Sequence, residues 1–332
     1  MKLIIQIIIS LILYTGTSGY AQSYPPAAGF EGSDAVHKDS SILKAWAVSA
    51  ELKRGLQNIS NPEGDTVSFG TVDNVLGAAQ GNPNVVSLGD GGSIILQFNH
   101  PICNGTGPDF AVFENGFRQD STSYNAFLEL AFVEVSSDGK NYYRFPAISE
   151  IQTETQTGSF TETDARYIHN LAGKYTGNYG TPFDLEEMKY YMNSNFNINN
   201  ITHIKIIDVT GTVNPEFASY DSNGNIINDP YPTNFPSGGF DADAVGVIHQ
   251  NRPESKNTLV ITNPASSFLS FPLGLPEIGE LYIYSVCGQL VFYQIIENQL
   301  FAIDIHQFET GAYIVKLKGL KKTYTQKVFV LQ

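Results

Sequence analysis

The sequence has few cysteines and few basic residues, and both shortages narrow the possible functions. Only two of its 332 residues are cysteine, Cys103 and Cys287, which excludes a disulfide-stapled scaffold and a zinc site built on several thiolates. Lysine and arginine number 19 against 33 aspartates and glutamates. The net charge of −14 is expected to repel nucleic acid and anionic lipid. The hydrophobic share of 42% is nevertheless enough to build folded cores.

Motifs for catalysis are also scarce. The six histidines show no HExxH or paired-ligand spacing, and the chain after residue 21 has no Gly-x-Ser-x-Gly elbow. Carboxylates are plentiful, so a glycoside hydrolase or lyase is an alternative. Glu129 and Glu134 differ by an odd number of positions and face opposite sides of one predicted strand. Glu114 and Glu129 could act together only if their strands are neighbours, and we do not expect an enzyme.

The first 21 residues have the features of a secretory signal peptide. Lys2 supplies the positive charge, residues 3–13 are almost wholly apolar, and Gly19 and Ala21 suit the −3 and −1 positions of a cleavage site. No later apolar run approaches the 18 or more residues of a membrane-spanning helix. A mature chain outside the cytoplasm, with no transmembrane segment, is therefore expected.

A change of composition predicts a domain boundary at residues 251–255, a polar stretch that contains a proline. Residues 252–332 carry a net charge of +1, whereas residues 1–251 carry −15. The expected domains are residues 22–251 and residues 252–332. Because the acidity belongs to the first domain, any cation-dependent function should be sought there.

The second domain consists of short β-branched or aromatic runs separated by turn residues, which predicts a small, Ig-like β-sandwich. The runs are residues 259–261, 281–284, 290–293, 313–317 and 328–330.

Four segments of this domain, in order, are Asn263-Pro264-Ala265, LYIYSVCGQLV (281–291), ETGAYIVKLKG (309–319) and QKVFVLQ (326–332). Together they resemble the type A, C-terminal sorting domain of the type IX secretion system of Bacteroidetes. The resemblance implies passage through the periplasm and an outer-membrane translocon, with the type IX machinery as partner. It also implies that the protein is secreted or displayed on the outer-membrane surface.

The first domain is predicted to be an antiparallel, jelly-roll β-sandwich, because strand patterns dominate it and no regular helices alternate with them. Two peripheral helices are expected, one at residues 43–52 and one at residues 185–192, the second capped by Asp184. The main predicted strands are residues 93–98, 109–113, 127–135, 204–209 and 244–248.

Several distinctive segments of this domain resemble an uncharacterised family of bacterial secreted or cell-surface proteins. They include VSLGDGGSIILQF (86–98), PICNGTGPDFAVFENGF (101–117) and FPSGGFDADAVGVI (235–248). The layout is also similar to galactose-binding-like jelly rolls. That similarity implies a structural calcium ion between the first and last strands.

One candidate calcium loop supplies oxygen-bearing groups at relative positions 1, 3, 5 and 9, namely Asp221, Asn223, Asn225 and Asp229. This spacing suits a hard cation that takes six to eight oxygen ligands. Two positions depart from the pattern, because Gly224 is at position 4 and Pro232 is at position 12. A hairpin turn built on Asn223-Gly224 is the alternative interpretation.

A second candidate pairs Asp241 with Asp243. Residues two apart on a strand share a face, so both carboxylates could contact one ion. Glu31, near the start of the mature chain, is the expected partner if the first and last strands are neighbours. The alternative is a solvated acidic edge.

Candidate ligand-binding residues are aromatic, because sugars bind to exposed aromatic faces beside polar groups. Tyr175, Tyr179 and Phe183 lie in a glycine-rich segment, and Tyr231 lies in a second loop. The leading prediction is a calcium-stabilised, non-catalytic protein that binds a glycan or another small extracellular nutrient. The alternatives are capture of a corrinoid of the cobalamin type, a carbohydrate-cleaving enzyme, and a structural adhesin.

Overall fold

The computed structural model describes residues 24–81, 83–251, 259–260, 262–271, 279–297, 302–320 and 323–332. The chain divides into two units, residues 1–251 and residues 252–332, and the boundary expected from the sequence lies at the same point. The expected signal peptide, residues 1–21, lies outside the described residues. Residues 252–255 of the expected boundary lie outside them too.

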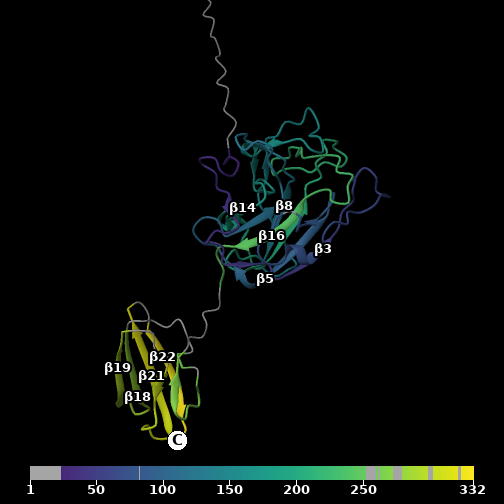
Figure 1. The fold of residues 1–332 in the computed structure, drawn as a ribbon. Coiled ribbons are helices and arrows are strands. Elements are labelled where there is room, and N and C mark those ends of the chain that lie inside the picture. The colour runs from purple at the N-terminus through teal and green to yellow at the C-terminus, as the bar shows by residue number, and fades with distance from the viewer. Residues whose placement is uncertain are drawn as a thin grey trace, which may run out of the picture. The chain divides into compact units, whose positions relative to one another are not determined.

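Two six-stranded antiparallel sheets form the body of the first unit, and Figure 1 labels strands from both. The first sheet has the order β1-β14-β6-β16-β2, with β4 beside β16. Its strands are β1 Val36–His37, β2 Ala45–Trp46, β4 Val86–Ser87, β6 Phe110–Glu114, β14 Tyr179–Phe183 and β16 Asp241–Val247.

The second sheet has the order β13-β8-β15-β5-β3, with β9 beside β8. Its strands are β3 Ser49–Lys53, β5 Ser93–Ile102, β8 Ala131–Ser136, β9 Tyr143–Arg144, β13 Leu171–Ala172 and β15 Ile201–Asp208. Two small ribbons complete the unit, β7 Asn125–Ala126 with β11 Thr163–Asp164, and β10 Ile148–Ser149 with β12 Ile168–His169.

One hydrophobic core lies between the two large sheets. Strand β15 contributes Ile204 and Ile206, β5 contributes Ile94 and Leu96, and all four are buried. Their spacing of two residues is the period of a strand with one buried face. Phe110 of the first sheet packs among them, so side chains of both sheets fill one core.

The central strand β16 is buried along its whole length. Its outer face is covered by a second cluster, in which the Trp46 ring lies 5.5 Å from the Phe113 ring between centroids. A strand that is covered on both faces has apolar residues at successive positions instead of alternating ones. This explains the sequence AVGV of residues 244–247.

Of the two predicted helices, the first is wrong. Residues 45–46 and 49–53 form β2 and β3, because Ala50 and Leu52 point toward the core with a period of two and pair with Leu96 and Ile94 of β5. The second is a 3-10 helix, η3 Leu185–Tyr191, and the Asp184 side chain caps it by accepting a hydrogen bond from the Glu186 amide at 2.9 Å. The other 3-10 helices are η1 Val72–Val75 and η2 Ala165–Tyr167.

The second unit contains a four-stranded antiparallel sheet, β19-β18-β21-β22, and a two-stranded ribbon, β17-β20, around its own core. The strands are β17 Phe268–Ser270, β18 Gly279–Ser285, β19 Leu290–Ile296, β20 Ala302–Asp304, β21 Gly311–Gly319 and β22 Thr323–Val330. The all-β prediction is confirmed, since 39% of the described residues are in strands and 5% are in helices. Among the described residues, no helix has the length and apolar character needed to span a membrane.

Replacement of Phe110 by alanine is predicted to destabilise the first unit by about 3–5 kcal/mol, because it opens a cavity in a packed core. The Phe110 ring is fully buried and lies 5.3 Å from the Phe183 ring and 5.9 Å from the Phe145 ring. Urea unfolding of the purified chain measures the change. Phe160→Ala is the control, because Phe160 is 67% exposed and its loss should change stability by about 0.5 kcal/mol or less. Equal effects of the two substitutions would contradict the packing described here.

Candidate functional site

Six buried carboxylates gather at one end of the sandwich of the first unit. The strand register brings them together: Glu114, the last residue of β6, pairs with Ala242 of β16. Asp208, the last residue of β15, pairs with Ala131, two residues after Glu129. We call the six residues the acid cluster; they are Asp90, Glu114, Glu129, Asp208, Asp229 and Asp241.

Burial raises the pKa of every carboxyl group in the acid cluster. The nearby carboxylates of Asp241 and Glu114 raise the pKa of Glu129 further, because like charges disfavour its ionised form. The pKa of Asp90 and that of Asp241 rise to about 6, where hydrogen bonds to each carboxylate limit the effect of burial.

Hydrogen bonds satisfy only part of the acid cluster. One oxygen of Glu114 accepts from the Gly116 amide at 2.6 Å, and the other, Oε1, is buried without a partner. One oxygen of Asp229 accepts from the Leu130 amide at 2.9 Å, and Oδ1 is likewise without a partner. An unpaired buried polar atom costs about 1–3 kcal/mol, and more when it is charged.

No cationic side chain compensates the acid cluster within the part of the chain that the structure describes. The lysines, arginines and histidines that form ion pairs there do so with other carboxylates. Among these described residues, no three His, Cys, Asp or Glu side chains converge closely enough to ligate one metal ion in the present geometry. The acid cluster therefore receives no counter-charge from the described residues, and its carboxyl groups are neutral only when they are protonated.

Two glycines allow the backbone to pack tightly against the acid cluster. A Cβ atom at Gly173 would lie 1.8 Å from the Glu129 carbonyl oxygen, and one at Gly239 would lie 2.6 Å from Asp208 Oδ1. Both glycines have positive φ, +82° and +70°, which favours glycine for a second reason. Side chains at these positions would push the loops away from the carboxylates.

A row of four aromatic rings, three of them exposed, adjoins the acid cluster. Successive ring centroids are 5.1, 6.3 and 5.7 Å apart along the residues that we call the aromatic row, Phe117, Phe127, Phe160 and Phe235. Phe117 and Phe127 form a β-bridge, three residues after Glu114 and two residues before Glu129. Phe117 is 48%, Phe160 67% and Phe235 40% exposed, whereas Phe127 is 8% exposed.

A groove of about 430 Å³ is lined by residues next to Phe160 in the sequence, and none of the four rings of the aromatic row lines it. It is lined by Thr157, Thr161 and Glu162, which flank Phe160 in sequence, and by the exposed ring of Tyr167. Hydroxyl and carboxylate groups next to exposed rings are the combination that sugars require.

The predicted calcium loop is a hairpin turn, as the alternative interpretation proposed. Asp221 Oδ1 accepts hydrogen bonds from the amides of Asn223 and Asn225 at 2.9 and 2.8 Å, so the backbone occupies it. Asn223 and Asn225 are exposed. Asp229 does not join them, because its side chain belongs to the acid cluster, and the prediction that these four residues share one ion is wrong.

The predicted grouping of Asp241, Asp243 and Glu31 is also wrong. A β-bulge between Ala242 and Ala244 breaks the alternation of β16. Asp241 contacts Ser87 and Asn115, whereas Asp243 accepts from the amides at positions 80 and 81, each at 2.9 Å. Glu31 is exposed and precedes β1, which β14 and β6 separate from β16.

The aromatic residues chosen from the sequence do not form a binding surface. Tyr175 and Phe183 are each only 1% exposed, because they pack into the core, and the prediction is wrong for both. The Tyr179 ring packs on His37 with centroids 5.0 Å apart, and the Tyr231 hydroxyl bonds to Asn58 and Ser60 at 2.8 and 2.7 Å. The aromatic row lies on other loops.

Sequence reasoning missed most of the acid cluster as a group, although the segments carry a signal. Glu114, Glu129 and Asp208 each lie within or at the end of an apolar strand run, in FAVFE, LELAF and IKIID. A carboxylate in such a run is seldom buried unless it is paired. That pattern could have directed the search for ligands to strand ends.

Comparison with known families identifies the second unit. Residues 260–331 match the family model described as a secretion system C-terminal sorting domain, which confirms the resemblance found in the sequence. The protein is exported by a type IX secretion system and is a secreted or outer-membrane surface protein. No curated protein matches the chain.

Two kinds of solved structure are similar to the chain at a low level. The BSP domain of a biofilm associated protein is 11% identical, and the match covers 76% of this chain and 51% of that one, with a TM-score of 0.17. A β-glucuronidase from Ruminococcus gnavus in complex with N1-substituted uronic isofagomine is 8% identical, with coverage of 88% and 46% and a TM-score of 0.20. The chain spans about half the length of these structures. TM-scores this low support no argument, so the jelly-roll and family resemblances of the first domain stay predictions.

The metal-free protein is predicted to lose stability as the pH rises from about 4 through 6 and above. The folded state binds more protons than the unfolded chain over this range, because the folded pKa values of Asp90 and Asp241 are about 6, against an ordinary value of 3.8. Urea unfolding of metal-free protein at about pH 5 and about pH 7.5 measures the difference. A higher unfolding free energy at the higher pH would contradict the uncompensated acid cluster.

Proposed function

Taking export by the sorting domain as the premise, we propose that the first domain is a calcium-stabilised, non-catalytic module that binds a glycan outside the cell. The proposal assigns calcium to the acid cluster and the glycan to the aromatic row with its groove. The two assignments are tested separately, because either can hold without the other.

The observation that carries the calcium assignment is the burial of six carboxylates with no cationic partner among the described residues. Removing a carboxylate from water costs several kcal/mol unless an opposite charge is present. Calcium accepts carboxylate and backbone oxygens in flexible geometry. The proposed ligands are the unpartnered oxygens of Glu114 and Asp229 together with Glu129 and Asp241, and binding includes rotation of these side chains toward the ion.

The aromatic row supports the assignment of a glycan. Exposed rings at Phe160 and Phe235 offer flat apolar faces to the C–H groups of sugars, and the adjacent groove offers hydroxyls and a carboxylate. Because Phe117 and Phe127 flank the acid cluster directly, an ion that fixes Glu114 and Glu129 would also fix the end of the row. Calcium and glycan binding are therefore expected to be coupled.

The same geometry argues against hydrolysis by the acid cluster. Glu114 is 1% exposed and Glu129 is 6% exposed, so a glycosidic bond cannot reach the pair. A general acid and its partner must contact the scissile bond or a water beside it.

Calcium is predicted to raise the thermal unfolding midpoint of the full chain. A concentration about 100 times the dissociation constant adds about 2.7 kcal/mol, which corresponds to about 5–10 °C for a domain of this size. Glu129→Gln removes one buried charge, so in chelator it should unfold at a higher temperature than the unmodified chain, and it should lose most of the calcium response. Differential scanning calorimetry in calcium and in chelator measures both effects.

Asp221→Asn is the matched control for this experiment. Asp221 is the first residue of the calcium loop that the sequence suggested, and its carboxylate is held by backbone amides. The variant should keep the full calcium response. Loss of the response in Asp221→Asn, with retention in Glu129→Gln, would move the ion to that loop and overturn the assignment.

Phe160→Ala is predicted to weaken glycan binding about tenfold, because the most exposed ring of the aromatic row is lost. Affinity electrophoresis through gels that contain xylan, galactomannan, pectin or mixed-linkage β-glucan measures retardation of the full chain. Tyr190→Ala is the control, since Tyr190 is 87% exposed and lies on η3, outside the row. Unchanged retardation of Phe160→Ala would reject the row as the binding surface, and release of new reducing ends would assign a hydrolase instead.

A further inference from the structure

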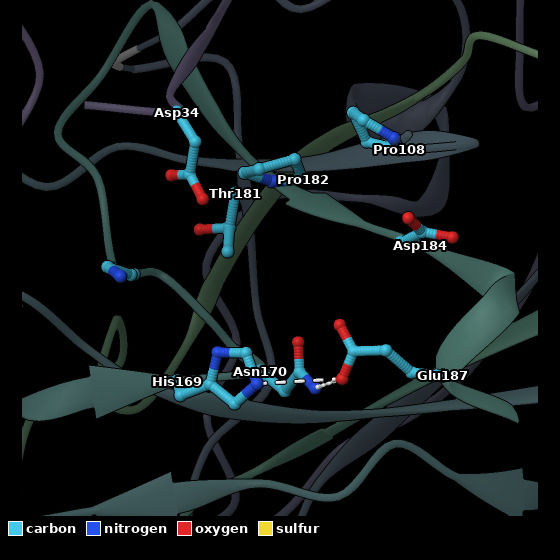
Figure 2. Close-up of a pocket in the computed structure, with 9 residues that line it drawn as sticks. Asp34, Pro108, His169, Asn170, Thr181, Pro182, Asp184 and Glu187 are labelled. Carbon is cyan, nitrogen blue, oxygen red and sulfur yellow. Dashed lines mark hydrogen bonds and ion pairs between the residues drawn. The ribbon is translucent and has the colours of Figure 1, made fainter. Parts of the chain in front are cut away.

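A separate polar pocket of about 240 Å³ lies between β14, β12 and η3 of the first unit (Figure 2). Figure 2 shows Asp34, Thr181, His169 and Glu187 arranged around one hollow. None of these residues belongs to the acid cluster or the aromatic row. The volume is below the range of about 300–1,000 Å³ typical of sites for drug-sized ligands, so it suits a molecule of about one ring.

Two groups that line the pocket lack the partners that burial requires. Thr181 is 3% exposed, and its hydroxyl has no hydrogen-bond partner. The Lys174 side chain is 4% exposed and donates no hydrogen bond among the described residues, although the nearby Asp34 carboxylate partly offsets the lowering of its pKa by burial. Its ammonium lies 5.4 Å from the centroid of the Tyr175 ring. A bound molecule with acceptor groups would satisfy both side chains.

Glu187, on the lower side of the pocket in Figure 2, is a hydrogen-bond acceptor that its neighbours hold in place. Glu187 Oε2 accepts from the Asn170 amide group at 2.6 Å and lies 3.5 Å from His169 Nε2. The His169 ring is itself stacked on Tyr24, with centroids 4.8 Å apart. These contacts leave Glu187 Oε1 for a donor from a ligand.

We propose that this pocket binds a single, uncharged monosaccharide ring through adjacent hydroxyl groups. Each sugar hydroxyl donates and accepts, so neighbouring hydroxyls can accept from Lys174 and Thr181 and donate to Glu187. Pro108 and Pro182 supply apolar surface for the C–H face of the ring. A ligand with a net negative charge is disfavoured because three carboxylates, Asp34, Asp184 and Glu187, line the pocket against one lysine.

The pocket rests on the proposed function for the class of its ligand. It adds to that function a second, enclosed sugar site. The aromatic row offers an open surface to a polysaccharide chain, whereas the pocket encloses one residue of it. The protein would therefore recognise a terminal sugar or a side branch in the pocket and the chain on the row.

Thr181→Val in the full chain tests the pocket. Valine keeps the shape but removes the unpartnered hydroxyl, so the fold should be as stable as before or more stable. Isothermal titration calorimetry with D-glucose, D-galactose, D-mannose, D-xylose and N-acetyl-D-glucosamine should show saturable binding of at least one sugar to the unmodified chain. Thr181→Val and Lys174→Met should each weaken that sugar roughly tenfold or more.

Ser149→Ala is the matched control, because the Ser149 hydroxyl is also buried without a partner but lies in β10, outside both this pocket and the groove. It should bind the monosaccharide as the unmodified chain does. Phe160→Ala should keep monosaccharide binding, which separates failure of the pocket from failure of the aromatic row. The proposal is overturned if no sugar of the panel binds, if Thr181→Val binds as tightly as the unmodified chain, or if a parallel titration shows that glycine or lysine binds in place of the sugars.

Discussion

Mutual repulsion among buried carboxylates is the constraint on which the first domain depends. Glu114 and Asp241 lie on strands of one sheet, Asp208 ends a strand of the other, and Glu129 precedes β8 of that second sheet. Each of the four is nearly inaccessible to water. Electrostatic energy of this kind opposes closure of the sandwich at that end. A fold that places the charges there must protonate them or bind a cation. The sorting domain directs the chain out of the cell, and there the carboxylates can bind a cation.

The ligand-binding surfaces follow from the same end of the fold. Phe117 follows β6, which ends at Glu114, and Phe127 precedes Glu129 in the segment that leads into β8. The Phe117 and Phe127 rings are only two or three residues from the carboxylates of Glu114 and Glu129. An ion that orders these carboxylates is therefore expected to order the two rings as well. The separate pocket at Thr181 lies on β14 and depends on η3, and its geometry does not require the ion.

Strands and helix caps depend on local sequence patterns and could be predicted from the sequence. Which side chains come together depends on strand register and packing, and this could not be predicted. Apolar, β-branched runs predicted β5 and β15, and Asp184 predicted the cap of η3. The bulge in β16 gives no sequence signal, yet it turns Asp243 away from Asp241. Glu114 ends β6, whereas Glu129 lies in the segment between the Phe117–Phe127 bridge and β8, so only the tertiary fold brings them together. Tyr175 and Phe183 looked like loop aromatics because glycines surround them, but burial decides their role.

The central claim is that a divalent cation lies among the carboxylates of Glu114, Glu129, Asp229 and Asp241. A crystal structure of the full chain grown with calcium, measured at a wavelength where calcium scatters anomalously, tests it most directly. The account predicts one anomalous peak within the acid cluster, with oxygen ligands at about 2.3–2.6 Å. Density that shows carboxyl groups hydrogen-bonded to one another at that place, with no anomalous peak, would contradict it.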